Sequence, residues 1–161
     1  MKRTFLLATL AIAISSNITF AQATTTKKNL AAAKGDTTKQ ISIPFKEAKN
    51  YFTNNNAKSG AVKIVTREMF DKYFGAAATM KTSGTKIDFS KQIVLAVIGQ
   101  QSKNTVSLEA KSVIKKADGT LILHYRKFVG KKQLYSSLTS LILIVDKQTV
   151  GTGNLEAVEI K

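Results

Sequence analysis

The chain has 161 residues, enough for one domain or for one small domain with an extension, and its formal net charge is +15. It contains no Cys and only one His, which excludes disulfides, cysteine nucleophiles and zinc sites built on Cys. Hydrophobic residues make up 43% of the chain, so it can build a core.

The first 23 residues have the order of a secretory signal peptide. Lys2 and Arg3 precede the apolar run 5–14, which is too short to cross a bilayer of about 30 Å as a helix. Residues 21–23 (AQA) supply the small residues that a signal peptidase reads, so we expect cleavage after Ala23. An uncleaved anchor is the alternative. The sequence therefore predicts an exported protein, periplasmic or secreted, with no membrane span.

The charge of the remaining 138 residues comes almost entirely from lysine. They carry 23 basic and 10 acidic side chains, a net charge of +13, and Arg67 and Arg126 are the only arginines among them. Such a charge attracts polyanions such as lipopolysaccharide or nucleic acid. Specific nucleic-acid readers rely on the bidentate contacts of arginine. We therefore expect weak polyanion binding and no specific recognition of nucleic acid.

Residues 24–40 lack apolar periodicity and are predicted to be a flexible linker before a single domain, residues 41–161. The alternating run 41–45 and the short run 61–65 predict strands, with Pro44 suited to an edge. Thr66 is a typical N-cap for a helix with an apolar stripe of two i, i+4 pairs, Met69 with Tyr73 and Phe70 with Phe74. Gly75 is expected to end this helix as the C′ residue.

The chain after this helix is rich in β patterns. The continuously apolar run 93–98 predicts a central strand covered on both faces. The next strand, in which Val106, Leu108, Ala110 and Ile114 share a face, is expected to turn at residues 118–119 into a strand over 121–128. A loop at 130–133 and strands at 138–145 and 155–160 follow. The fold class predicted is α+β, a mostly antiparallel meander of six or seven strands with one main helix packed on it.

No group of residues forms a recognisable catalytic, cofactor or metal motif. His124 lies on a mixed strand face beside Arg126, without a nucleophile and an orienting partner at a revealing spacing. The segment Gly151-Thr152-Gly153 lacks the helix start of a phosphate loop and predicts a turn before the last strand. We therefore expect a protein that is not an enzyme and has no cofactor; a hydrolase with scattered catalytic groups is the further alternative.

Four segments together resemble a known family. In the one-letter code they are EMFDKYFG (68–75), KIDFSKQIVLAVIG (86–99), GKKQLYSSLT (130–139) and LILIVDK (141–147). Their order resembles the PrcB-like family of exported bacterial domains, named after a protease-complex subunit, and related uncharacterised secreted proteins. The resemblance implies a non-enzymatic domain that stabilises or inhibits another exported protein, such as a protease or hydrolase.

The sequence thus predicts an exported module that binds a protein of the envelope or the medium, with polyanion binding as the alternative function. Loops on a rigid sheet commonly carry recognition, which favours the loops 100–104 and 130–135. Tyr135 is expected to be an anchor, with packing inside a strand as its alternative role. The candidate contact residues are Gln101, Lys103, Lys131, Lys132, Gln133 and Tyr135.

Overall fold

The computed structural model describes residues 40–77 and 83–161, all of which belong to the compact unit Asp36–Lys161. Of the described residues, 56% lie in strands and 9% in helices. The predicted signal peptide, residues 1–23, and the predicted linker up to residue 39 lie outside the described residues. Neither helix of the described part is long and apolar enough to span a membrane.

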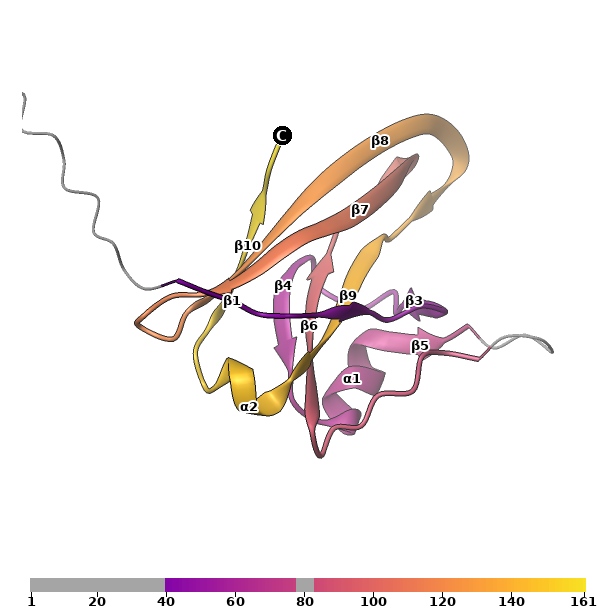
Figure 1. Cartoon of the computed structure of the whole chain (residues 1–161). Helices are drawn as coiled ribbons and strands as arrows, with labels where there is room; N and C mark the ends of the chain where they lie inside the picture. Colours follow the sequence, from indigo (N-terminus) through magenta and orange to yellow (C-terminus); the bar gives the residue numbers. More distant parts are fainter. Residues whose placement is uncertain (1–39, 78–82) are drawn as a thin grey trace, which may run out of the picture. The chain divides into compact units, whose positions relative to one another are not determined.

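Two four-stranded sheets and one two-stranded sheet form the described part (Figure 1). Sheet A contains, in spatial order, β1 (Ile41–Ser42), β7 (Ser102–Lys115), β8 (Leu121–Ser137) and β10 (Leu155–Glu159). Sheet B contains, in spatial order, β2 (Lys46–Glu47), β9 (Ser140–Asp146), β6 (Gln92–Ile98) and β4 (Gly60–Ile64). The small sheet pairs β3 (Tyr51–Thr53) with β5 (Phe74–Ala76), and the helices are α1 (Arg67–Tyr73) and α2 (Lys147–Val150).

Sheet B is the central layer because both of its faces are buried. On one face, Ile93 and Leu95 of β6 pack in a cluster with Leu121 and Leu123 of sheet A. On the other face, Val94 of β6 belongs to a second cluster that includes residues of α1 and β5. The continuous apolar run in β6 therefore reflects burial on both sides, and the prediction of a covered central strand is confirmed.

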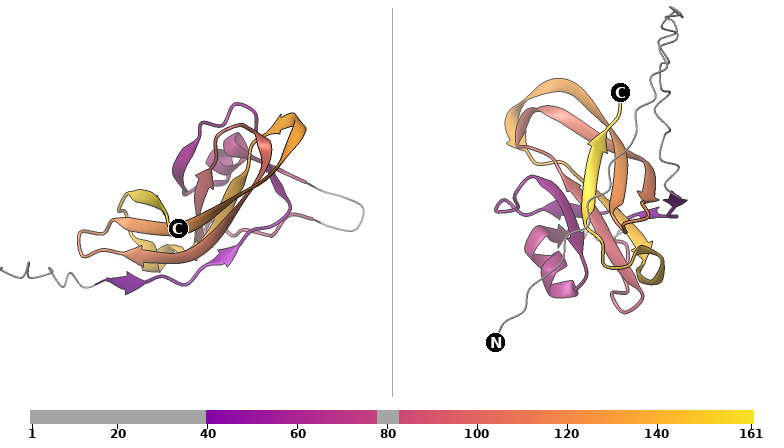
Figure 2. Two further views of the ribbon diagram at one scale, coloured as in Figure 1. Left: turned by 90° about the horizontal axis from the view of Figure 1, so that it is seen from above. Right: turned by 90° about the vertical axis from the view of Figure 1, so that its left-hand side faces the viewer.

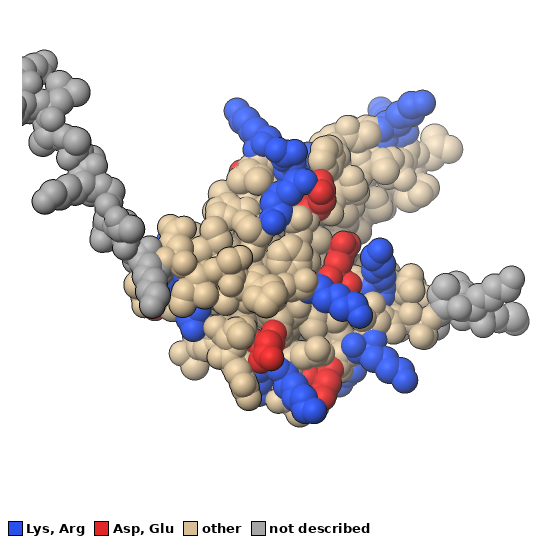
Figure 3. Space-filling view, in the orientation of Figure 1, with Lys and Arg blue, Asp and Glu red and all other residues tan. Residues whose placement is uncertain are grey.

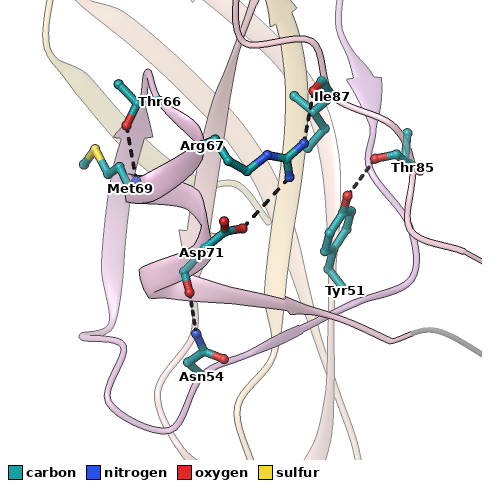
Figure 4. A network of polar contacts seen from close by, with 8 residues as sticks. All are labelled: Tyr51, Asn54, Thr66, Arg67, Met69, Asp71, Thr85 and Ile87. Atoms are coloured by element: carbon teal, nitrogen blue, oxygen red, sulfur yellow. Dashed lines mark hydrogen bonds and ion pairs between the residues drawn. The ribbon is translucent and has the colours of Figure 1, made fainter.

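Helix α1 is fixed by its cap and by its contacts with neighbouring segments (Figure 4). The Thr66 hydroxyl accepts a hydrogen bond from the Met69 amide at 3.2 Å, which confirms the predicted N-cap. The Arg67 guanidinium donates to the Ile87 carbonyl at 3.3 Å. The Tyr51 hydroxyl of β3 donates to the Thr85 carbonyl at 2.7 Å, so β3 and the segment before β6 are tied together beside the helix.

Gly75 does not end the helix as a C′ residue, so this prediction is wrong. The helix ends at Tyr73, and the extended backbone of Phe74 leads directly into β5. Gly75 pairs with Phe52 across the small sheet, and a Cβ at Gly75 would lie 2.3 Å from the Phe52 ring. The absence of a side chain at Gly75 therefore makes room for an aromatic ring.

The antiparallel sheets and the small helix content agree with the prediction, whereas the single meander of six or seven strands does not. The strands divide between separate sheets, and β10 pairs with β8 in parallel. The reason is the short helix α2, which replaces the predicted turn after β9. Asp146 caps it by accepting from the Gln148 amide at 2.8 Å, and the chain then crosses to the other sheet.

A β-bulge between Ala110 and Ser112 changes the faces of β7 that the alternation predicted. Leu108 and Ala110 face the core as expected, but after the bulge Val113 is fully buried and Ile114 is only partly buried. The prediction that Ile114 shares a face with Leu108 and Ala110 is therefore wrong, because one extra residue reverses the pattern beyond it.

Candidate functional site

Sheets A and B are joined by the bend of one long two-stranded ribbon. β6 continues into β7 through residues 99–101, and β8 continues into β9 through residues 138–139. These two strands stay paired on both sides of the bend, so β6 pairs with β9 and β7 pairs with β8. The predicted loop at 130–133 is therefore part of β8, which bends instead of stopping.

The strand on the outside of the bend contains extra residues. Ser102 lies opposite Ser137 and Asn104 lies opposite Lys132, so the four residues 133–136 face Lys103 alone. We call residues 128–136 of β8 the arch. Figure 1 shows this part of β8 curving outward past the start of β7 before the chain returns as β9.

The arch exposes large apolar side chains to solvent. Leu134 is 103% exposed and Tyr135 is 66% exposed, while Phe128 and Val129 are at least half exposed. The Tyr135 side chain therefore faces solvent, and its alternative predicted role, packing inside a strand, is wrong. Exposed apolar side chains that gather on one projection are typical of contact surfaces.

The inner side of the bend is a cleft of about 740 Å³ between the two sheets. This volume lies within the range of about 300–1,000 Å³ that is usual for ligand sites. Val97, Leu108 and Ala157 provide apolar surface, while Gln100 and Gln101 provide amides. The complete lining consists of Ser59, Gly60, Ala61, Val97, Ile98, Gly99, Gln100, Gln101, Ser102, Val106, Leu108, Tyr125, Lys127, Val129, Ala157 and Glu159.

Two strand edges border this cleft. β4 is the last strand of sheet B and β10 is the last strand of sheet A, so each has an edge that pairs with no other described strand. On either side of β10, the Asn154 carbonyl accepts from the Leu121 amide and the Ile160 amide donates to the Tyr125 carbonyl, both at 2.8 Å. Alternate residues of a strand point their backbone groups to opposite sides, so Ala157 and Glu159 direct theirs away from β8. The cleft is thus bordered by main-chain donors and acceptors that the sheets do not use.

The cleft holds one charge of each sign beside a phenol. Tyr125 lies opposite Glu159 in the register of β8 and β10, and Lys127 lies two residues further along the same face of β8. Burial, and after it the negative charge of Glu159, raise the pKa of the Tyr125 hydroxyl above its ordinary value. Tyr125 therefore stays protonated near neutral pH and can donate a hydrogen bond.

The structure brings the two predicted contact loops together at the bend. Gln101 lines the cleft, and Lys103 lies opposite the arch. The other four candidates belong to the arch, where Lys131, Lys132 and Tyr135 are exposed and Gln133 is partly buried. The Gln133 amide donates to the Ser137 hydroxyl at 3.4 Å, which places Gln133 among the contacts that hold the arch.

His124 lines neither the cleft at the bend nor the cleft beside β4 and the loop before β10. Its Nδ1 is 3.0 Å from the Ser112 hydroxyl, with which it pairs across β7 and β8. Neither residue is among those that line the clefts. No cluster of three metal-ligating side chains occurs in residues 40–77 and 83–161.

A second cleft, of about 600 Å³, lies where β4 meets the loop before β10. The Lys63 ammonium donates to the carbonyls of Gly151 and Gly153, both at 2.8 Å. Burial, and after it the nearby Lys115, lower the pKa of Lys63. Since the ammonium already binds two carbonyls, it holds the loop in place, and Gly151–Gly153 is the turn that the sequence predicts.

Sequence reasoning missed several residues of the bend, above all Phe128, Val129 and Leu134. The signal for them is the adjacent apolar pair Phe128-Val129, which follows the two charged residues Arg126 and Lys127. Lysines and a glycine follow, and then Leu134 and Tyr135 stand side by side. Adjacent apolar residues in a strand point to opposite faces, so at least one of each pair must face away from a one-sided core.

No family model, curated protein or solved structure matches the chain. The resemblance to the PrcB-like family therefore stays a prediction that rests on the four segments quoted above.

Proposed function

We propose that this protein is an exported, non-enzymatic module that binds an extended segment of another exported or envelope protein in the cleft at the bend. The observation that carries this proposal is the pair of open strand edges, β4 and β10, that borders the cleft. An extended peptide can add to such an edge through its main chain, while side-chain pockets provide selectivity.

The chemistry of the cleft suits a peptide. Val97, Leu108 and Ala157 offer apolar surface, and Lys127 and Glu159 offer one charge of each sign. Gly60 is the first residue of β4 and lines the cleft. No neighbouring atom lies within 4 Å of the position that its Cβ would occupy, so the main chain of a bound peptide can approach there. The family resemblance points to the same class of partner, an exported protein such as a protease.

The test is affinity capture from the native envelope and culture fluid, with washes of increasing salt. The variant Gln101→Trp places a bulky ring in the cleft, and Ser107→Trp places the same ring at an exposed position of β7 that does not line the cleft. We expect one protein to stay bound to the wild type and to Ser107→Trp through high salt, and to be lost from Gln101→Trp.

Equal retention by Gln101→Trp would contradict the proposed site. Broad retention that disappears as salt rises would instead support the alternative function, a basic envelope protein that binds polyanions, because phosphate contacts weaken steeply with salt.

A further inference from the structure

We propose that the arch docks on an anionic lipid bilayer, with Leu134 and Tyr135 entering the boundary between headgroups and acyl chains and lysines binding the lipid phosphates. This goes beyond the proposed function, since it concerns the outer side of the bend and not the cleft.

The first observation is the exposure of the apex. Leu134 is as exposed as a side chain can be, and Tyr135 beside it is two-thirds exposed. Both lie among the extra residues on the outside of the bend, which no residue of β7 except Lys103 faces. The apex of the arch can therefore reach into a flat surface before the rest of the sheet touches it.

The second observation is the charge around the apex. Lys131 and Lys132 lie in the arch, Lys103 lies opposite, and no acidic residue occurs between positions 128 and 137. The three ion pairs found among residues 40–77 and 83–161 involve other lysines and Arg67. In Figure 3 the basic side chains (blue) at the outer end of the β7–β8 ribbon have no acidic neighbour (red) on the visible face.

The kind of cation decides between possible partners of this surface. Protein interfaces are enriched in arginine and depleted in lysine, and readers of nucleic acid depend on the planar arginine fork. The charged residues of the arch are all lysine, which acts as a point charge and needs only a dense field of phosphates. A fully exposed leucine beside a tyrosine adds what a lipid boundary favours, since tyrosine is apolar along its ring and polar at its tip.

The test is co-flotation of the exported protein with lipid vesicles at low and high salt. We expect binding to phosphatidylcholine vesicles that contain roughly one third phosphatidylglycerol, and little binding to pure phosphatidylcholine. Lys131→Gln with Lys132→Gln should lower the partition coefficient about tenfold or more, because each lysine near the surface contributes separately. Leu134→Ser with Tyr135→Ser should lower it by a similar factor without changing the net charge.

Two matched variants control for loss of charge and of apolar surface elsewhere. Lys86→Gln with Lys91→Gln removes the same charge before β6, and Ile41→Ser with Val158→Ser removes two exposed apolar side chains of sheet A. Both should bind like the wild type. All the proteins compared share one N-terminus, so any contribution of the apolar run 5–14 cancels.

Insertion has its own readout because the chain contains no Trp. In the variant Tyr135→Trp the single indole should shift its emission to shorter wavelength on anionic vesicles and should become protected from an aqueous quencher. Bound protein without this shift would overturn the proposal. So would vesicle binding that survives the loss of Leu134 and Tyr135, or control variants that bind as weakly as the arch variants.

Discussion

Gly153 lies where two turns from distant parts of the sequence meet. It lies in the loop before β10, where a Cβ would come to 1.8 Å from the Gly119 carbonyl oxygen in the turn of the β7–β8 hairpin. Gly119 itself has a φ of 87°, in the region that favours glycine. Two glycines therefore allow two turns that are far apart in the sequence to touch through their backbones.

We predict that Gly153→Ala destabilises the protein by about 2 kcal/mol or more, because the added methyl group must push two backbone segments apart. Gly130→Ala is the control, since a Cβ there meets only ordinary contacts with Thr105 at 3.5 and 3.6 Å. Urea unfolding followed by circular dichroism measures both. Equal midpoints for the two variants would show that the loop before β10 yields easily.

Two aspartates stabilise turns through their side chains. Asp88 accepts from the amide and the hydroxyl of Ser90 at 3.0 and 2.6 Å, and Asp118 accepts from the Thr120 amide at 2.8 Å. These hydrogen bonds favour the ionised form and lower the pKa of both carboxyl groups in the folded protein.

A group whose pKa is lower in the folded state stabilises the fold above its unfolded pKa and loses that effect as the pH falls. We therefore predict that the free energy of unfolding decreases between about pH 5 and pH 2. The decrease should be smaller in Asp88→Asn with Asp118→Asn, whose turns no longer titrate. Denaturant unfolding at a series of pH values measures this, and parallel curves for the two proteins would contradict the assignment.

At the level of elements, α1 is too short to be stable on its own. Its seven residues are far fewer than the roughly 12–15 that an isolated helix needs. Phe70 fixes it to sheet B, being 1% exposed and in contact with the rings of Tyr51, Phe74 and Phe89 at centroid distances of 5.0, 5.2 and 5.8 Å. Tertiary packing, more than helix propensity, therefore maintains this element.

Substitution of the cap and of the core residue should separate the two contributions. We predict that Thr66→Ala costs about 1 kcal/mol, the usual value for loss of an N-cap. Phe70→Ala should cost about 3–5 kcal/mol, because it leaves a cavity where several rings meet. Thermal and urea unfolding measure both variants. A larger loss from Thr66→Ala than from Phe70→Ala would show that the cap, and not the packing, holds the helix.

At the level of the whole described unit, stability is concentrated in the middle layer. β6 and β9 are buried along almost their full length, whereas β8 becomes exposed once it passes Tyr125. In the right-hand view of Figure 2, the curved end of the β7–β8 ribbon lies at the top and α1 lies near the bottom. The arch is thus a region with little support from the core.

Native-state hydrogen exchange should report this gradient. We predict that amides of β6 and β9 exchange last, through global unfolding, while amides of residues 131–136 exchange through local opening several orders of magnitude faster. Exchange measured by NMR or mass spectrometry tests it. Uniform protection along β8 would contradict the view that the arch lies outside the cooperative core.

The features that depend on neighbouring residues could be predicted from the sequence. The N-cap at Thr66, the covered strand β6 and the turn at residues 118–119 follow from local chemistry and short-range pattern. The candidate contact residues follow from the rule that loops carry recognition, and the structure places them around one bend. Their role stays a prediction.

The features that depend on residues far apart in the sequence could not be predicted from the sequence. The bulge at Ala110–Ser112, the ring of Phe52 over Gly75 and the parallel pairing of β10 with β8 each need a partner from another part of the chain. A one-residue bulge or a crossover leaves almost no trace in local alternation, because its cause is the register of the partner strand.

The sequence by itself determined a lysine-rich chain with antiparallel β structure, few helices and a buried central strand, because composition and periodicity act locally. Only the tertiary structure decided that one ribbon bends between two sheets, so that a cleft lies inside the bend and an apolar arch outside it. The physical reason is that the longer strand must take the outer path, and its extra residues then have no partner in the neighbouring strand.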